Sequence, residues 1–408
     1  MRVILHSDLN NFYASCECLL RPELKGLPVV VCGKIKDRHG VVLAKNMIAK
    51  NAGIKTGMTL YEARKLQPNL EAVEANHDLY LKYSRLVKKI YSDYTDRIES
   101  FGIDEAWLDV TESVKLFGSG ETIAELIRKR VREEIGLTVS IGVSYNKIFA
   151  KLGSDIKKPD AVTVIDKNNY KDIVWSLPVS DLLYVGKATT KKLNALGIYK
   201  IGHLAKFDRC ILRQKLGKWG EYLSEYANGN DLSIVCKMGE SDDIKSVGNS
   251  VTYYRDMDKL EDVMALIYML AESVSYRMKK SCVGRAKTLH ISVVDNELTH
   301  YGMQCAFTNP TNLSNDIAST AIELYKKNYI HIKKVRGVGV SVSNFVKEEQ
   351  LLLGESQKNK DKLLKLDNTI EDIRRRFGRK SVCRALTKLD ARLQDVEING
   401  ANITSRAL

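Results

Sequence analysis

Hydrophobic and polar positions near the start of the chain change from a strand-like period to a helix-like period and back. Residues 137–143 alternate strictly between apolar and small side chains, the pattern of a half-buried strand, and residues 79–94 carry an apolar stripe at helical spacing. The predicted elements are, in order, strand, helix, hairpin, helix and strand over residues 2–8, 79–94, 98–110, 123–135 and 137–143. This order predicts a ferredoxin-like α+β fold.

Residues 20–75 interrupt this order and are predicted to form an inserted region. Residues 29–31 have the apolar run of a short buried strand. Thr59 and Glu62 have the spacing of a capping box, in which two side chains satisfy the first free amides of a helix. The helix that begins there should end before Pro68.

The remaining sequence predicts a helical region and then a second α+β region. Residues 177–206 have a helical pattern, and residues 228–245 are polar and charged, as expected for a linker. Periodicity then predicts strands at 288–293 and 337–343 and helices at 261–280 and 314–327. Residues 347–408 are charge-dense and contain one helical candidate, at 363–377.

Composition narrows the class of protein. The 408 residues correspond to two to four domains at about 150 residues each, and 64 Lys and Arg against 50 Asp and Glu give a net charge of +14. This excess favours nucleic acid or anionic lipid as a partner, although a mildly basic enzyme would also fit. No apolar run approaches the ~18 residues of a membrane helix and no signal-peptide core is present, so we expect a cytoplasmic protein with no membrane contact. The eight cysteines form no C-x-x-C pair, which favours reduced thiols over a zinc site.

Three carboxylates are the strongest chemical signal. Asp8 ends the first predicted strand, and Asp104 and Glu105 lie at the bend of the predicted hairpin. Because these strands are neighbours in a ferredoxin-like sheet, the three side chains can converge on one edge. Hard divalent cations relieve the repulsion among such groups, and two Mg²⁺ ions can stabilise both oxygens of a phosphoryl displacement. The alternative is ordinary turn chemistry, in which acidic side chains cap turns.

Three longer motifs surround these carboxylates. They read His-Ser-Asp-Leu-Asn-Asn-Phe-Tyr-Ala-Ser-Cys-Glu at 6–17, Ile-Asp-Glu-Ala-Trp-Leu-Asp at 103–109, and Ser-Tyr-Asn-Lys-Ile-Phe-Ala-Lys at 144–151, followed by Lys158-Pro159. In content, order and spacing they resemble the motifs of the Y-family DNA polymerases, the DinB and UmuC translesion enzymes. Weaker similarity extends to about residue 390.

The resemblance implies an error-prone, template-directed DNA polymerase that acts in damage tolerance, DNA repair and the SOS response. Asp8, Asp104 and Glu105 would be its catalytic, metal-binding carboxylates. Leu9 would add a backbone carbonyl to one of two Mg²⁺ ions, for which Mn²⁺ can substitute. A primer 3′-hydroxyl would attack the α-phosphate of a deoxynucleoside triphosphate, so primer–template DNA and these nucleotides are the implied partners of a monomeric enzyme.

The same resemblance implies a nucleotide pocket beside the carboxylates. Tyr13 would be the steric gate that excludes a 2′-hydroxyl, with Asn11 and Phe12 next to it in the pocket. Lys158, held extended by the proline after it, would contact the triphosphate. The alternatives are a core aromatic at Tyr13 and a solvated surface charge at Lys158.

The inserted region departs from the commoner family pattern. DinB-like members carry Ser or Thr, Tyr and Arg where this chain has Ala44, Met47 and Lys50. Lys50 can replace an arginine as a point charge but not as a bidentate donor, and Met47 lacks the tyrosine hydroxyl. Lys50 is therefore retained as a nucleotide contact. This form is closer to UmuC-like members, and the branch stays open.

Residues 183–197 resemble the helix-hairpin-helix of the family's thumb. Gly186 would let backbone amides approach a DNA phosphate, and Lys187 and Lys191 would add cationic contacts. Tyr184 stands where many such hairpins carry their first glycine. The alternative is a helical hairpin that does not touch DNA.

Two further segments resemble DNA-associated parts of the family. Residues 246–346 resemble the little finger, an α+β domain that would bind phosphates along the major groove. Gln350, Leu351 and Leu353 resemble the motif that docks on a sliding clamp, although Gly354 replaces the usual terminal aromatic. A leucine-rich tail without a partner is the alternative.

The resemblance divides the chain into the parts of such a polymerase. These are a palm at 1–19 and 76–165, fingers at 20–75, a thumb at 166–236, a linker at 237–245, a little finger at 246–346 and a tail at 347–408. Two other classes of protein are alternatives, a palm-domain nucleotide cyclase and a non-catalytic DNA-binding relative. The helix-hairpin-helix and the lysine-rich third motif argue against the cyclase, and the complete set of carboxylates argues against the non-catalytic relative.

Overall fold

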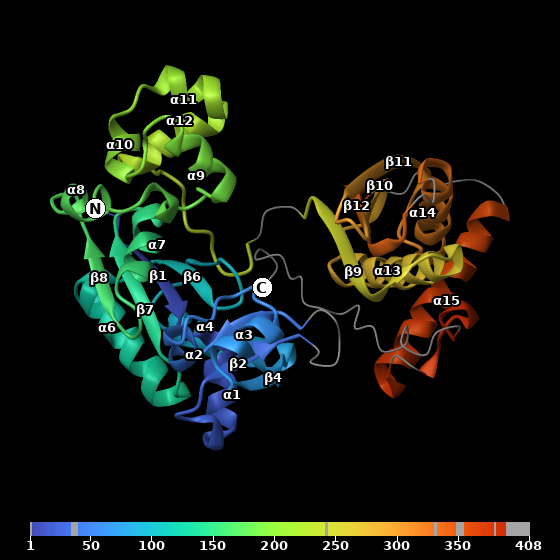
Figure 1. Cartoon of the computed structure of the whole chain (residues 1–408), viewed down its shortest axis with the longest axis horizontal. Coiled ribbons are helices and arrows are strands. Elements are labelled where there is room, and N and C mark those ends of the chain that lie inside the picture. The colour runs from blue at the N-terminus through green and yellow to red at the C-terminus, as the bar shows by residue number, and fades with distance from the viewer. Residues whose placement is uncertain are drawn as a thin grey trace. The chain divides into compact units, whose positions relative to one another are not determined.

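The computed structural model describes residues 2–33, 40–240, 244–329, 333–347, 355–378 and 381–388. Its chain divides into two compact units, and the described residues up to 240 belong to the first and those from 244 to the second (Figure 1). The clamp-motif candidates Gln350, Leu351 and Leu353 lie outside the described residues. Within those residues, no helix combines the length and apolarity needed to cross a membrane.

A five-stranded sheet forms the centre of the first unit. Its strands are β1 (Ile4–Leu9), β5 (Ile98–Ser100), β6 (Glu105–Asp109), β7 (Val139–Ser144) and β8 (Val162–Ile165). The order is β5-β6-β1-β7-β8, with β7 and β8 parallel and the other pairs antiparallel. The first four strands confirm the predicted ferredoxin-like order. The edge strand β8 is an addition that the periodicity did not predict.

Helices pack on both faces of this sheet (Figure 1). Helices α4 (His77–Ser92) and α6 (Gly120–Arg130) bury the apolar stripes predicted for them. The short α5 (Val114–Phe117) precedes α6, and a π-helix over Val131–Ile135 continues α6. Helix α7 (Lys147–Ile156) packs on the opposite face. Its close approach requires Gly142 on β7, because a Cβ there would lie 2.5 Å from the backbone nitrogen of Ser154.

Strand β1 is buried on both of its faces, and this determines where its polar residues point. Leu5 and Leu9 belong to the core under α4 and α6, whereas Ile4 packs with Trp107 and Ala150 on the α7 side. Side chains alternate along a strand, so Asp8 lies on the same side as Ile4, toward α7.

The inserted region forms a smaller sheet with its own core. Its elements are α1 (Phe12–Leu20), a 3₁₀ turn at Pro22–Leu24, β2 (Val29–Cys32), β3 (Val42–Lys45), α2 (Met47–Asn51), α3 (Leu60–Leu66) and β4 (Glu71–Glu74). The strand order is β3-β2-β4. The predicted capping box is confirmed, since Thr59 and Glu62 bond each other's backbone amides at the start of α3.

A helical region completes the first unit. Its elements are α8 (Tyr170–Val174), a 3₁₀ turn at Val179–Asp181, α9 (Lys187–Asn194), α10 (Ile201–Lys206), α11 (Arg209–Leu216) and α12 (Lys218–Ala227). They enclose a core that includes Leu193, Leu204, Leu212 and Leu223, all fully buried. The helical pattern predicted for residues 177–206 is confirmed, and α11 and α12 extend it.

The predicted linker begins as a segment bound to the first unit. The carbonyl of Gly229 accepts a bond from the Asn146 side chain, and Asp231 accepts one from the backbone of Lys147. Val235 is fully buried beside Trp107. Residues 228–235 therefore lie along α7 and the sheet, although their polar composition suggested a free connection.

The second unit is a four-stranded antiparallel sheet with two long helices. Its elements are β9 (Ser246–Met257), α13 (Leu260–Lys280), β10 (Arg285–Asp295), β11 (His300–Thr311), α14 (Ser314–Asn328) and β12 (Val335–Val346), in the sheet order β11-β10-β12-β9. Side chains of α13, α14 and one face of the sheet form a single apolar core. The two strands and two helices predicted here are confirmed, and β9 and β11 are additional.

The described part of the C-terminal segment packs against the second unit. Helix α15 (Glu355–Phe377) contains the predicted helical candidate, and a 3₁₀ turn follows at Ala385–Lys388. Glu272 of α13 receives hydrogen bonds from Arg374 at 2.9 Å and from Arg384 at 2.8 Å. Asp367 of α15 pairs with Lys279 and accepts the backbone amide of Ser314. This part of the predicted tail is therefore a packed element of the unit.

Candidate active site

The antiparallel pairing of β1 and β6 brings two of the predicted carboxylates opposite each other. Asp8 is the direct register partner of Glu105, and the two residues therefore project toward the same face of the sheet. Asp104 precedes Glu105 at the hairpin bend, where the Asp104 carbonyl accepts a hydrogen bond from the backbone amide of Leu9 at 3.0 Å. This register brings Asp8 and Glu105 together at one edge, with Asp104 next to Glu105 in the chain.

Two lysines meet the carboxylates from the α7 side. Lys151 Nζ lies 2.9 Å from Glu105 Oε2 and 3.3 Å from Asp8 Oδ2. Lys158 Nζ lies 2.9 Å from the same Asp8 oxygen. Asp155, one turn after Lys151, is exposed and pairs with both lysines, so the five side chains form one ionic network around the buried Asp8.

The raised pKa values of Asp8 and Asp104 show that ionisation of these carboxylates is unfavourable at this edge. Burial raises the pKa of Asp8, and the nearby Lys151 offsets this only in part. Burial and the charges of Glu105 and Asp8 raise the pKa of Asp104 to about 6. Burial alone would lower the pKa of Lys151, but its three acidic neighbours raise it instead. The edge can therefore accept more positive charge than the two lysines bring.

A buried histidine borders the network and was missed by the sequence prediction. His6 Nδ1 lies 2.9 Å from the Ser154 hydroxyl, and Nε2 lies 3.3 Å from Glu105 Oε2. Burial, reinforced by Lys151, lowers the pKa of His6 well below its ordinary value, so the ring is neutral. Its place on β1 two residues before Asp8 was the available signal, since alternate residues of a strand share a face.

The donor set suits a hard divalent cation, although it is not gathered as a closed metal cage. Glu105 Oε2 is buried and accepts no hydrogen bond of good geometry within the described residues. All three candidate ligands are carboxylates, which Mg²⁺ prefers. Among the described residues, however, no three His, Cys, Asp or Glu side chains are close enough together to hold a metal. The two lysines occupy the surroundings of Asp8 and Glu105 instead.

Tyr13 stands on α1 beside this edge, on a stack of aromatic rings. Its ring lies parallel to that of Tyr80, with centroids 4.2 Å apart, and the Tyr80 hydroxyl donates to the buried Glu17 at 2.7 Å. Burial and the charge of Asp104 raise the pKa of Tyr13. Phe12 is buried in the core behind it, and Asn11 takes a left-handed conformation at the helix start. Tyr13 is partly buried, and its stack on Tyr80 fixes the plane of its ring.

The loop that carries Lys158 is bound to the end of β1 by a residue that the sequence prediction overlooked. Asn10 donates to Ser140 at 2.9 Å and accepts the backbone amide of Asp160 at 2.9 Å. Asp160 in turn pairs with Arg128 and Arg132. These bonds hold the loop so that Lys158 reaches Asp8.

The remaining predicted residues are not part of this network. Lys50 is exposed on α2, which Asn46 caps, and its charge contributes to lowering the pKa of the partly buried Lys45. Lys50 and Lys45 thus give the inserted region a local positive charge.

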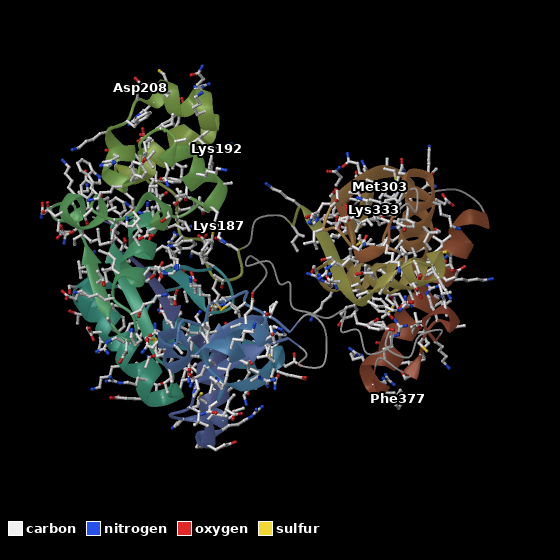
Figure 2. All side chains as sticks on the ribbon, in the orientation of Figure 1. Lys187, Lys192, Asp208, Met303, Lys333 and Phe377 are labelled. Carbon is white, nitrogen blue, oxygen red and sulfur yellow. The ribbon has the colours of Figure 1, made fainter. Side chains whose placement is uncertain are left out.

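Gly186, Lys187 and Lys191 lie together at the start of α9 in the helical region. Gly186 is the N-cap of α9, and the two lysines line an open cavity of about 580 Å³ together with Thr190. Lys187 and Lys192, on the same helix, are marked in Figure 2. A glycine cap, a helix N-terminus and lysine side chains are the donors that bind a phosphate.

Comparison with known proteins identifies the relatives of this chain. The impB/mucB/samB family model matches residues 7–155, and the model of that family's C-terminal domain matches residues 244–354. The DNA polymerase IV of Acetivibrio thermocellus is 49% identical over 97% of this chain and 100% of the relative. The DNA polymerase IV of Clostridium kluyveri is 36% identical over 92% of this chain and 96% of the relative. The DNA polymerase IV 1 of Bacillus subtilis is 34% identical over 95% of this chain and 93% of the relative.

Solved structures show the same fold. A Y-family DNA polymerase chimera of Dbh and Dpo4 matches with a TM-score of 0.75 at 24% identity, over 85% of this chain and 100% of the chimera. An insertion ternary complex of Dbh DNA polymerase matches with a TM-score of 0.60 at 24% identity, over 85% of this chain and 100% of that chain. The α+β architecture is therefore that of Y-family polymerases.

Proposed function

This chain belongs to the Y family of DNA polymerases, and we propose that it extends a primer on a DNA template in the error-prone, translesion manner. The observation that carries the proposal is the pairing of Asp8 with Glu105 across β1 and β6, with Asp104 at the adjoining bend. A cyclase or a non-catalytic relative is not favoured by relatives that are all DNA polymerases. The proposed activity includes DNA damage tolerance and repair.

Asp8, Asp104 and Glu105 would hold two divalent ions, with Mg²⁺ as the proposed metal and Mn²⁺ as a substitute. Such ions stabilise the attacking and leaving oxygens of a phosphoryl displacement. Leu9 would contribute its carbonyl at the end of β1. Burial and the charges of Glu105 and Asp8 raise the pKa of Asp104 to about 6, and this unfavourable ionisation supports metal binding there.

Lys151 and Lys158 would orient the charged groups of the reaction. Lys151 pairs with both Asp8 and Glu105 from the α7 side. Lys158 lies close enough to Asp8 to reach a triphosphate bound at the same edge, and its pairing with Asp155 limits its freedom. Such preorganised positive charge favours the transition state, because little reorganisation is needed when the leaving group develops charge.

Tyr13 would select the sugar of the incoming nucleotide. The ring is fixed by its stack on Tyr80, so it can exclude a 2′-hydroxyl by contact rather than by a hydrogen bond. Asn11 and Phe12 would shape the same pocket, and Lys50 would add charge from the inserted region. Sugar selection by one rigid ring fits a pocket that otherwise tolerates damaged bases.

The other proposed contacts are with DNA and accessory proteins. Gly186, Lys187 and Lys191 would bind a primer–template phosphate, and the sheet of the second unit would grip the duplex without reading its sequence. Docking of Gln350, Leu351 and Leu353 on a sliding clamp, a monomeric state and a cytoplasmic location complete the proposal.

Primer extension by Asp104→Ala tests the proposed activity. With Mg²⁺ and a template that carries one abasic site, the variant should extend at least about 1,000-fold more slowly than the wild type while DNA affinity stays within about twofold. Asp96→Ala is the matched control, because Asp96 is an exposed carboxylate paired only at the surface with Lys237. Near-normal extension by Asp104→Ala would show that the carboxylate edge is not the catalytic centre.

A further inference from the structure

Four aromatic rings form a continuous surface on the helical region of the first unit. Trp219, Tyr222 and Tyr226 lie along one face of α12, at the spacing that brings helical side chains together. Tyr184, from the loop before α9, lies 5.5 Å from Trp219 and 6.3 Å from Tyr226 between ring centroids. Trp219 and Tyr222 are 5.8 Å apart. We name Tyr184, Trp219, Tyr222 and Tyr226 the aromatic shelf.

The aromatic shelf exposes more ring surface than the fold requires. Tyr184 is 44% exposed, Trp219 41% and Tyr222 39%. Large aromatic side chains are usually buried, and groups of them at a surface often mark a site of contact. The core of the helical region is complete beneath them, since Leu212 and Leu223 are fully buried.

The backbone conformation at Tyr184 is a second, independent indication that its ring has a function. Its φ is 72°, in the left-handed region that is unfavourable for a bulky side chain and that glycine adopts readily. The position is also one where similar hairpins carry glycine. The Tyr184 ring thus stands at a position where a side chain strains the backbone, and it extends the aromatic shelf.

Charged side chains of both signs border the aromatic shelf, and the acidic neighbour Asp231 adds to burial in raising the pKa of Tyr226. Lys218 Nζ lies 5.6 Å from the Tyr222 ring centroid, and Lys187 and Lys191 line a cavity together with Val185, the residue after Tyr184. The acidic residues of α12 are held by the preceding helix, because Glu221 pairs with Arg213 and Glu225 with Arg209. Exposed rings beside cations suit a chain that presents flat bases and phosphates together.

We propose that the aromatic shelf binds unpaired nucleotides of a nucleic acid strand by stacking, next to the phosphate contact of the α9 hairpin. This proposal rests on the proposed function, which makes DNA the substrate. A duplex offers phosphates but keeps its base faces stacked on one another, so the rings select single-stranded nucleotides. Lys187, Lys191 and Lys218 bind the backbone of the same strand.

Binding of a fluorescein-labelled oligothymidylate of about 12 nucleotides tests the proposal by fluorescence anisotropy. The comparison probe is a strand of the same length with abasic deoxyribose at every position, which keeps the phosphates and removes the bases. The full-length wild type should bind the oligothymidylate about tenfold more tightly than the abasic strand. Equal affinities would overturn the proposal.

Variants separate stacking from charge. Trp219→Leu should lose about tenfold in affinity for the oligothymidylate and leave the abasic strand unchanged, whereas Lys187→Ala should weaken both and reduce the salt slope by about 0.7. Trp219→Phe should restore the preference for bases. Tyr199→Leu, an exposed ring outside the aromatic shelf, is the matched control. Equal losses on both strands in Trp219→Leu would assign that residue to folding or charge and contradict the stacking role.

Tyr184→Gly removes a ring of the aromatic shelf in a variant that is expected to fold. Glycine relieves the left-handed backbone while it removes the ring, so thermal stability should not fall but the preference for bases should weaken. An unchanged preference would exclude Tyr184 from the site. The binding assay contains no metal or nucleoside triphosphate and measures no synthesis. Loss of base preference would therefore say nothing against polymerase activity, and loss of primer extension by the wild type would say nothing against stacking.

Discussion

The five-stranded sheet of the first unit and the four-stranded sheet of the second differ in how deeply their polar side chains are buried. Every residue of β1 and β7 is buried, and Asp8 is enclosed between the sheet and α7 with Lys151. In the second unit, α13 and α14 cover one face, and the buried residues of β10 alternate with half-exposed ones. On that other face Ser341 of β12 has Gly248 and His290 as its register partners, a surface of small and polar groups.

The difference teaches where single residues matter. In the first sheet, ionic groups interact in a poorly hydrated space, so the loss of one leaves its partners unpaired. On the open face of the second sheet, water replaces a lost contact and each residue contributes little. Chemistry in this polymerase should therefore depend on individual side chains of the first unit, and DNA affinity on the sum of many weak contacts in the second.

Tyr13→Ala should have the largest effect of the three changes that examine this contrast. Removing the ring opens the space beside Asp104 where a 2′-hydroxyl would lie, so ribonucleotide incorporation should rise about 100-fold relative to deoxyribonucleotide incorporation. The measurement is kcat/KM for each nucleotide on one primer–template.

Two controls define what that result means. Tyr13→Phe keeps the ring and should keep the selectivity. Tyr301→Ala removes a partly exposed ring from the second sheet and should leave sugar selection unchanged. Unaltered discrimination in Tyr13→Ala would remove the gate role from this residue and weaken the contrast between the two sheets.

Much of the first sheet could be predicted because its periodicity is simple. The strict alternation of 137–143 and the stripe that became α4 gave clear signals, and the ferredoxin-like order then placed Asp8 beside Glu105. Strand β8 was not predicted because it has only four residues and pairs in parallel with β7, from which α7 separates it in the chain. Strand β11 escaped because most of its side chains are exposed, so it carries little apolar alternation.

The ionic network at the site could be predicted only in part. Motif resemblance pointed to Asp8, Asp104 and Lys158, but not to the bridge that Lys151 makes between Asp8 and Glu105. That bridge depends on how closely α7 approaches the sheet, which the pair Gly142 and Gly153 permits, and such packing has no local signature.

Asp104→Asn should change stability with a sign that reveals the repulsion at the edge. Because burial and its acidic neighbours raise the pKa of Asp104 from 3.8 to about 6, the folded protein binds a proton there more readily than the unfolded chain. Ionisation of Asp104 therefore costs stability as pH rises through about 6, and the amide variant avoids that cost. Without metal at pH 7, Asp104→Asn should melt about 2 to 4 °C higher than the wild type.

The pH dependence is the decisive part of this measurement. The advantage of Asp104→Asn should shrink as pH falls through 6 and vanish near pH 4, where both side chains are neutral. Asp96→Asn should show no such gain, because Lys237 lowers the pKa of Asp96. Thermal unfolding followed by circular dichroism in EDTA gives both curves, and a variant less stable than the wild type at pH 7 would contradict the proposed repulsion.

Lys287→Ala should have the smallest effect, and that smallness is the informative result. Lys287 is exposed at the irregularity in β10, where it can contact one phosphate of a duplex. Loss of one such contact should weaken duplex binding about two- to fourfold at low salt and reduce the slope of log K against log salt by about 0.9. Primer extension at saturating DNA should stay at the wild-type rate, since no reacting group is touched. If Lys287→Ala instead lowered kcat as strongly as a carboxylate variant, the second sheet would have a direct part in chemistry and the division of labour between the two sheets would be wrong.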